Sequence, residues 1–148
     1  MKRLTYIFTA LLLLTSCNSE IQQLTGTYSY KASGEASIEN VSTSLDDEIG
    51  TLEVIPINKK DSFRLIFNQV GGPVYTTVGL LYNEGKKLDL KKFERSINAS
   101  AINYSVQVTG DGDILDGIIM LKLNYFGQSS AGIDIKCDNV LMVAKKND

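Results

Sequence analysis

The chain has 148 residues, a formal net charge of -2, and no histidine or tryptophan. The weak negative charge argues against nucleic-acid binding, which needs clustered basic side chains. The lack of histidine excludes histidine general bases, Ser-His-Asp triads and histidine metal sites.

The first 16 residues have the composition of an export signal. Lys2 and Arg3 precede an apolar run over residues 4–14, whereas a transmembrane helix needs about 20 apolar residues. The following Leu14–Cys17 resembles the lipobox of bacterial lipoproteins. This resemblance implies cleavage after residue 16, lipid on the sulfur of Cys17, and attachment to a membrane through that lipid. The alternative is an ordinary secretory signal with an incidental cysteine.

These features predict three segments: a signal peptide over 1–16, a lipidated cysteine and tether over 17–24, and one domain over 25–148. Removal of Lys2 and Arg3 brings the mature part to a net charge of about -4. Residues 18–21 carry only one acidic side chain, Glu20, which favours an outer-membrane anchor facing the periplasm over surface exposure. With Cys17 lipidated, Cys137 has no disulfide partner, and its apolar neighbours predict a buried side chain.

Alternation of apolar and polar residues predicts β-strands through the whole domain. The alternation is clearest around Tyr104, Val106 and Val108. The predicted strands are 26–33, 50–57, 63–68, 74–82, 86–93, 102–109, 114–126 and 133–143. In the fourth of these we expect the row from Val74 through Val78 to Tyr82 to face inward.

The segments between these strands are predicted turns and connections. Residues 35–48 and 94–101 lack alternation, and residues 110–113, rich in glycine and aspartate, are predicted to turn a hairpin. A register slip is expected near Asn139. Short connections favour antiparallel neighbours, and about eight such strands lose their edges best in a closed, mostly up-and-down barrel. The alternative is a two-sheet sandwich with a crossover between Lys91 and Ile102.

The residues at the start of the first strand carry a family resemblance. Leu24-Thr25-Gly26-Thr27-Tyr28 is similar to the Gly-x-Trp signature of lipocalins, with tyrosine in place of tryptophan. The strand rhythm resembles that of calycin-like lipoproteins of Bacteroides-type bacteria. The resemblance implies a lipocalin-like barrel whose closed end is plugged by Tyr28. The second lipocalin motif, with its arginine, is missing near the C-terminus.

No catalytic constellation is found, so we expect a protein that is not an enzyme and that uses no cofactor or metal. Asp111-Gly112-Asp113 lacks the further oxygen ligands of a calcium loop and is better explained as a turn. Residues 46–48 and Gly71-Gly72 are interpreted as a solvated acidic loop and a turn.

Aromatic residues on the apolar rows of the strands are the remaining functional signal. An eight-stranded barrel is just wide enough to be filled by side chains or to hold one small ligand. The sequence therefore predicts either a pocket for a small apolar or amphipathic ligand, or a solid barrel whose surface binds an envelope protein or a glycan. The candidate ligand-binding residues are Tyr28, Tyr30, Phe63, Phe67, Tyr82, Tyr104 and Tyr125.

Overall fold

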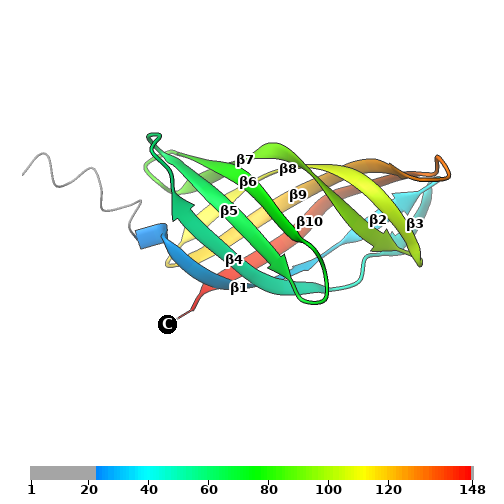
Figure 1. The fold of residues 1–148 in the computed structure, drawn as a ribbon, viewed down its shortest axis with the longest axis horizontal. Coiled ribbons are helices and arrows are strands. Elements are labelled where there is room, and N and C mark those ends of the chain that lie inside the picture. Colours follow the sequence, from blue (N-terminus) through cyan, green and yellow to red (C-terminus); the bar gives the residue numbers. More distant parts are fainter. Residues whose placement is uncertain (1–22, 148) are drawn as a thin grey trace, which may run out of the picture.

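The computed structural model describes residues 23–147, which contain ten β-strands (Figure 1). The predicted signal peptide and Cys17 lie outside the described residues. The strands are β1 (Gly26–Ser33), β2 (Glu35–Ile38), β3 (Val41–Ser44), β4 (Glu48–Pro56), β5 (Ser62–Gln69), β6 (Val74–Tyr82), β7 (Lys87–Ala99), β8 (Ile102–Leu115), β9 (Ile118–Ser129) and β10 (Asp134–Lys146).

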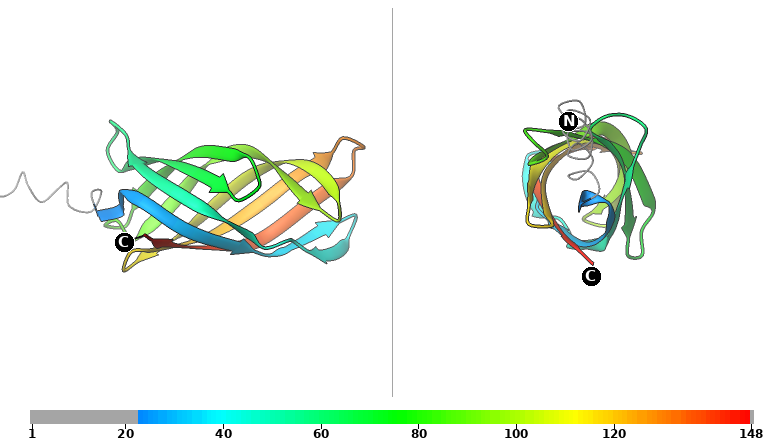
Figure 2. Two further views of the ribbon diagram at one scale, coloured as in Figure 1. Left: turned by 60° about the horizontal axis from the view of Figure 1, so that its bottom comes forward. Right: turned by 90° about the vertical axis from the view of Figure 1, so that its left-hand side faces the viewer.

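Eight of these strands close into one antiparallel barrel. Hydrogen-bonded neighbours follow the order β1-β4-β5-β6-β7-β8-β9-β10, and β1 pairs with β10 from Tyr28 opposite Lys146 to Ser33 opposite Leu141. The end view in Figure 2 shows the resulting ring. The predicted all-β antiparallel barrel is therefore confirmed. The alternative two-sheet sandwich is wrong because one continuous sheet contains all ten strands.

The other two strands, β2 and β3, form a short hairpin beside the barrel. β2 pairs with the start of β10 through Ile38 opposite Ile135, and β3 pairs only with β2 in this part of the chain. Glu39 and Asn40 make the turn with positive φ angles of 49° and 69°. The sequence predicted no regular strand over 35–48, because four-residue strands are too short to display a clear alternation.

The barrel interior is filled by the predicted inward rows of most strands. In β1, Tyr28, Tyr30 and Ala32 are buried while the residues between them are exposed. Large buried side chains, including Phe63 and Leu121, pack toward the end where the chain enters. The Tyr28 hydroxyl donates a hydrogen bond of 2.9 Å to the Leu24 carbonyl at this end. The entry end is therefore packed with side chains.

The inward face of β6 is opposite to the predicted one. Tyr75 and Thr77 are buried, whereas Val74 and Tyr82 are 61% and 49% exposed. Pairing with β5 fixes this face, since Tyr75 lies opposite the inward-facing Phe67. Both rows of β6 contain apolar residues and threonine, so alternation alone cannot identify the buried one.

The turn that joins β8 to β9 is Asp116-Gly117, not the predicted 110–113. Asp116 and Gly117 have φ angles of 48° and 75°, as in a two-residue hairpin turn. Gly110 and Gly112 instead lie on the inner row of β8. A Cβ atom on Gly112 would lie only 1.9 Å from a carbonyl oxygen of β9, so this glycine allows close approach of the two strands.

The predicted connection over 94–101 is also mostly strand. β7 continues to Ala99, and Ser100 and Ala101 turn the chain with positive φ angles. A buried arginine, Arg95, interrupts the apolar row and hides the alternation. The predicted slip near Asn139 is confirmed by a register shift between Cys137 and Val140.

A search of residues 23–147 for a membrane-spanning helix finds none of sufficient length and hydrophobicity.

Candidate functional site

A pocket of about 440 Å³ opens at one end of the barrel, between buried and exposed residues, and we call it the end pocket. Its walls come from the chain segments around the β3–β4 connection, the β5–β6 turn and the second half of β7. These segments lie away from the end where residues 23–26 enter the barrel (Figure 2). The lining residues are 32–33, 45–48, 69, 71–73, 95–98, 103, 125 and 140.

The end pocket lies beside the part of the barrel where β6 and β7 separate. Their ladder covers only Gly79–Tyr82 and the facing residues of β7, and no further rungs join these two strands within residues 23–147. Side chains bridge the separated part. The Thr77 hydroxyl donates to the Lys91 carbonyl at 2.7 Å, and the Tyr75 hydroxyl donates to the Ser96 carbonyl at 2.8 Å. Polar side chains thus replace a backbone ladder at this wall.

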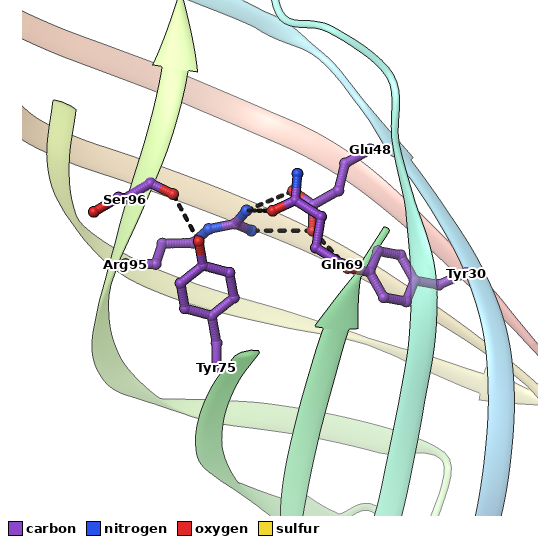
Figure 3. Close-up of polar contacts among 6 residues, drawn as sticks. All are labelled: Tyr30, Glu48, Gln69, Tyr75, Arg95 and Ser96. Atoms are coloured by element: carbon purple, nitrogen blue, oxygen red, sulfur yellow. Dashed lines mark hydrogen bonds and ion pairs between the residues drawn. The ribbon is translucent and has the colours of Figure 1, made fainter. Parts of the chain in front are cut away.

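Arg95 lies at the centre of the polar groups, because β7 directs its side chain inward. The side chain is 4% exposed, and its two terminal nitrogens contact the two oxygens of Glu48 at 3.3 and 2.6 Å (Figure 3). Gln69 accepts a further hydrogen bond of 3.2 Å. This bidentate geometry is the strong form of an arginine–carboxylate pair.

Glu48 is held from its other side by Tyr30. The Tyr30 hydroxyl donates to Oε1 of Glu48 at 2.6 Å. Burial and this hydrogen bond raise the pKa of Tyr30 well above its ordinary value, so the hydroxyl remains a donor at neutral pH. Glu48 therefore accepts from Arg95 and Tyr30 together.

Two tyrosine rings contact the guanidinium group of Arg95. Its central carbon lies 4.3 Å from the ring centroid of Tyr75 and 5.7 Å from that of Tyr125. Burial acts to lower the pKa of Arg95. The electrostatic effects of Tyr125, Glu48 and Tyr75 outweigh burial, and the pKa of Arg95 is raised. The arginine is therefore a fixed cation, neutralised by Glu48 and packed against aromatic faces.

Three buried polar atoms have no hydrogen-bond partner within the described residues: Arg95 Nε and the hydroxyl oxygens of Tyr104 and Tyr125. Arg95 and Tyr125 line the end pocket, whereas Tyr104 does not. Burial raises the pKa of Tyr125 above its ordinary value, so its hydroxyl keeps its proton. Unpartnered buried groups are rare in folded proteins and call for an explanation.

The structure separates the seven predicted ligand-binding residues into three groups. Tyr125 lines the pocket, and Tyr30 does not line it but bonds to Glu48 of the polar cluster. Tyr28, Phe63, Phe67 and Tyr104 are buried in the core and do not line the pocket. Tyr82 lies on the outer face of β6, so its predicted inward placement is wrong.

Sequence reasoning missed four residues of the site: Glu48, Gln69, Tyr75 and Arg95. Glu48 was assigned to a solvated acidic loop, but its side chain is 12% exposed and ion-paired. A usable signal was present in β7, where Phe93, Arg95, Ile97 and Ala99 alternate with polar residues. That row places a charge among inward-facing apolar side chains.

The remaining candidate features lie apart from the pocket. Cys137 is buried, and burial together with Asp138 raises its pKa to about 11, which disfavours a reactive thiolate. Asp113 forms an ion pair with Lys87 on the barrel exterior. Within residues 23–147, no cluster of three or more acidic or cysteine side chains could hold a metal ion.

Comparison with known proteins identifies one feature of this chain. Residues 1–18 match the family described as prokaryotic membrane lipoprotein lipid attachment site. No curated protein matches the chain, and no solved structure does. The chain is therefore a lipoprotein with a β-barrel, anchored to the cell envelope through lipid on its N-terminal cysteine.

Proposed function

We propose that this lipid-anchored barrel binds a small amphipathic molecule in the end pocket and has no catalytic role. The observation that carries the proposal is a pocket of about 440 Å³ next to a buried cluster of charged and aromatic side chains. Ligand sites commonly occupy about 300–1,000 Å³ and use a few placed polar groups for orientation. Arg95 and Glu48 bind each other, which suits orientation of a ligand better than proton transfer.

The lining of the pocket supports an amphipathic ligand over a purely apolar one. Leu45, Ile97 and Val140 offer apolar surface. Asp46 and Asn98, in contrast, offer hydrogen-bonding groups that an apolar ligand would leave unpaired. The pocket at this end of the barrel supports the predicted ligand site, whereas the entry end is packed with side chains.

Two finer features belong to the same proposal. An outer-membrane anchor facing the periplasm is supported by the single acidic residue within 18–21, Glu20. Membership of the lipocalin-like, calycin-like lipoproteins is supported by the eight-stranded closure and by Tyr28, which is fully buried at the entry end. Fold similarity alone does not identify a ligand.

A second candidate function is binding of an envelope protein to the outer surface. Ile49, Val70 and Val74 are 52%, 69% and 61% exposed, and they lie close together, since Val70 bonds to the Ile49 carbonyl and Val74 pairs with Asn68. Exposed apolar patches commonly mark interaction sites.

The test of the pocket is native mass spectrometry of the lipoprotein purified from its own envelope. We expect a co-purifying small molecule in the unmodified protein and its loss in Ile97→Trp, which fills the pocket. Ile49→Trp makes the same change on the outer surface and should retain the molecule. Retention in Ile97→Trp, or absence of any bound molecule in the unmodified protein, would contradict the pocket function.

A further inference from the structure

The unpartnered groups at the end pocket define what a ligand must supply. Arg95 Nε is a donor without an acceptor, and the Tyr125 hydroxyl can donate or accept. Both side chains are more than nine-tenths buried and both line the pocket. Neither atom is open to solvent, so a ligand oxygen that accepts from Arg95 Nε and pairs with the Tyr125 hydroxyl must enter between the pocket side chains, where it removes the cost of leaving both groups unpaired.

The charge around the pocket indicates that this oxygen belongs to an uncharged group. Both oxygens of Glu48 already neutralise Arg95, so the cation is not free for an anionic ligand. A carboxylate that displaced Glu48 would leave a buried charge and would also break the bond from Tyr30. Asp46 at the pocket wall repels anions further, whereas Asp47 is paired with Lys31 at 2.6 Å.

The wall also offers groups that suit hydroxyl hydrogens. Asp46 is exposed, lines the pocket and has no side-chain hydrogen bond within residues 23–147. Asn98 and Asn103 also line the pocket and lack side-chain hydrogen bonds in this range, and they stand on the outward rows of β7 and β8. Planar carboxylate and amide groups of this kind can accept from neighbouring hydroxyls, and the amides can also donate.

We propose that the end pocket selects an uncharged, hydroxyl-bearing ligand of the glycoside class. One ligand oxygen accepts from Arg95 Nε and bonds to the Tyr125 hydroxyl, while other hydroxyls bond to Asp46 and Asn98. The apolar side chains of Leu45, Ile97 and Val140 cover a hydrophobic substituent. This inference rests on the proposed binding function and adds the chemical class of the ligand.

The test compares ligands that share the sugar ring and the aglycone and differ at C6, where a carboxylate replaces a hydroxymethyl group. Binding of para-nitrophenyl glucoside and para-nitrophenyl glucuronide is measured on the full lipoprotein by saturation-transfer NMR titration, with the galactoside and the N-acetylglucosaminide as further neutral probes. We expect at least one neutral glycoside to bind, and the glucuronide to bind at least about tenfold more weakly.

The second arm compares two hydroxyl deletions. Tyr125→Phe and Tyr104→Phe each remove a buried, unpartnered hydroxyl, so neither variant should lower the melting temperature. Tyr125→Phe should weaken glycoside binding about tenfold because a ligand hydrogen bond is lost. Tyr104→Phe should leave binding unchanged, since Tyr104 lies outside the pocket lining.

The outcomes distinguish this inference from the binding function beneath it. Tighter binding of the glucuronide, or equal binding by Tyr125→Phe and the unmodified protein, would overturn the glycoside assignment alone. The glycoside assignment alone would also be overturned if no glycoside bound but the protein carried a co-purified molecule that Ile97→Trp removes. Failure of every glycoside together with no co-purified molecule would overturn both proposals.

Discussion

At the scale of single residues, the buried ion pair between Arg95 and Glu48 is the feature with the largest consequences. The two side chains are 4% and 12% exposed, so each charge depends on the other for compensation. Replacement of a whole buried ion pair by apolar groups is often tolerated. Removal of one partner is not, because the other charge then remains buried and unpaired. The pair therefore provides a sensitive test of the described site.

Arg95→Met is expected to lower the free energy of unfolding by about 3–5 kcal/mol, because Glu48 would remain buried without its cation. Urea denaturation measures this change. The double variant Arg95→Met/Glu48→Leu should recover part of the loss. Lys136→Met, which breaks an exposed pair with Asp138, should cost less than about 1 kcal/mol. Equal losses from Arg95→Met and Lys136→Met would contradict the buried pair.

Only part of this cluster could have been predicted from the sequence. Tyr30 was placed on the inner row of its strand by simple alternation. The inward placement of Arg95 and Glu48 is not predicted, because isolated charged residues usually lie on the surface. A charged side chain can be buried without a large energetic cost only when it has a partner of opposite charge. That partner comes from a distant strand, which no local pattern reveals.

At the scale of elements, β6 shows how a strand's face is determined by its neighbour. Tyr75 lies opposite Phe67 of β5, and this pairing turns Val74 and Tyr82 outward. Strands with one apolar row, such as β8, were assigned correctly. The sequence predicts a face reliably only where the two rows differ in polarity.

Two neighbouring threonines of β6 test its face. Thr77 is buried and donates to the Lys91 carbonyl, whereas Thr76 is exposed. Thr77→Asp should destabilise the protein by about 3 kcal/mol or more, since it buries an unpaired carboxylate. Thr76→Asp should change the melting temperature little. A larger loss of stability from Thr76→Asp than from Thr77→Asp would mean that the inward face of β6 is the one predicted from the sequence.

The same comparison applies to β8, whose register was predicted correctly. Val106 is 1% exposed and Gln107 is exposed. Val106→Asp should prevent stable folding or lower the melting temperature strongly, while Gln107→Asp should be nearly silent. Thermal unfolding is monitored by circular dichroism. The two variants would lower the melting temperature by similar amounts only if the register of β8 were shifted by one residue.

At the scale of the whole molecule, the barrel has two different ends. The described chain enters at the packed end, and the end pocket lies away from it. Five residues lie between Cys17 and Gln23, so the six Cα-to-Cα steps that join them span at most about 20 Å. The lipid anchor therefore keeps the packed end near the membrane.

Lipidation can be tested by Cys17→Ser, which removes the acceptor sulfur. We expect this variant to lose partitioning into the detergent phase and to retain its signal peptide. Labelling with an alkyne fatty acid provides the direct measurement. Cys137→Ser is the matched control and should still be labelled, and continued labelling of Cys17→Ser would contradict the anchor at that residue.

The buried tyrosines predict a loss of stability in alkali. Burial raises the pKa of Tyr28, Tyr30 and Tyr125 above the ordinary value near 10. Their contribution is fully present below about pH 10 and is lost above it, because the unfolded chain then releases protons that the folded chain retains. Between its unfolded and its folded pKa, each such tyrosine should cost at most about 1.4 kcal/mol per pH unit. Urea midpoints that stay constant from pH 9 to 12 would contradict this expectation.

The pairing of β1 with β10 has a consequence for biogenesis. The two strands that complete the ring are the first and the last of the barrel along the chain. A chain that is exported from its N-terminus must expose the free edge of β1 until residues 134–146 have followed. Such an edge pairs readily with other chains and promotes aggregation. The nascent lipoprotein is therefore expected to depend on a holding chaperone until translocation is complete.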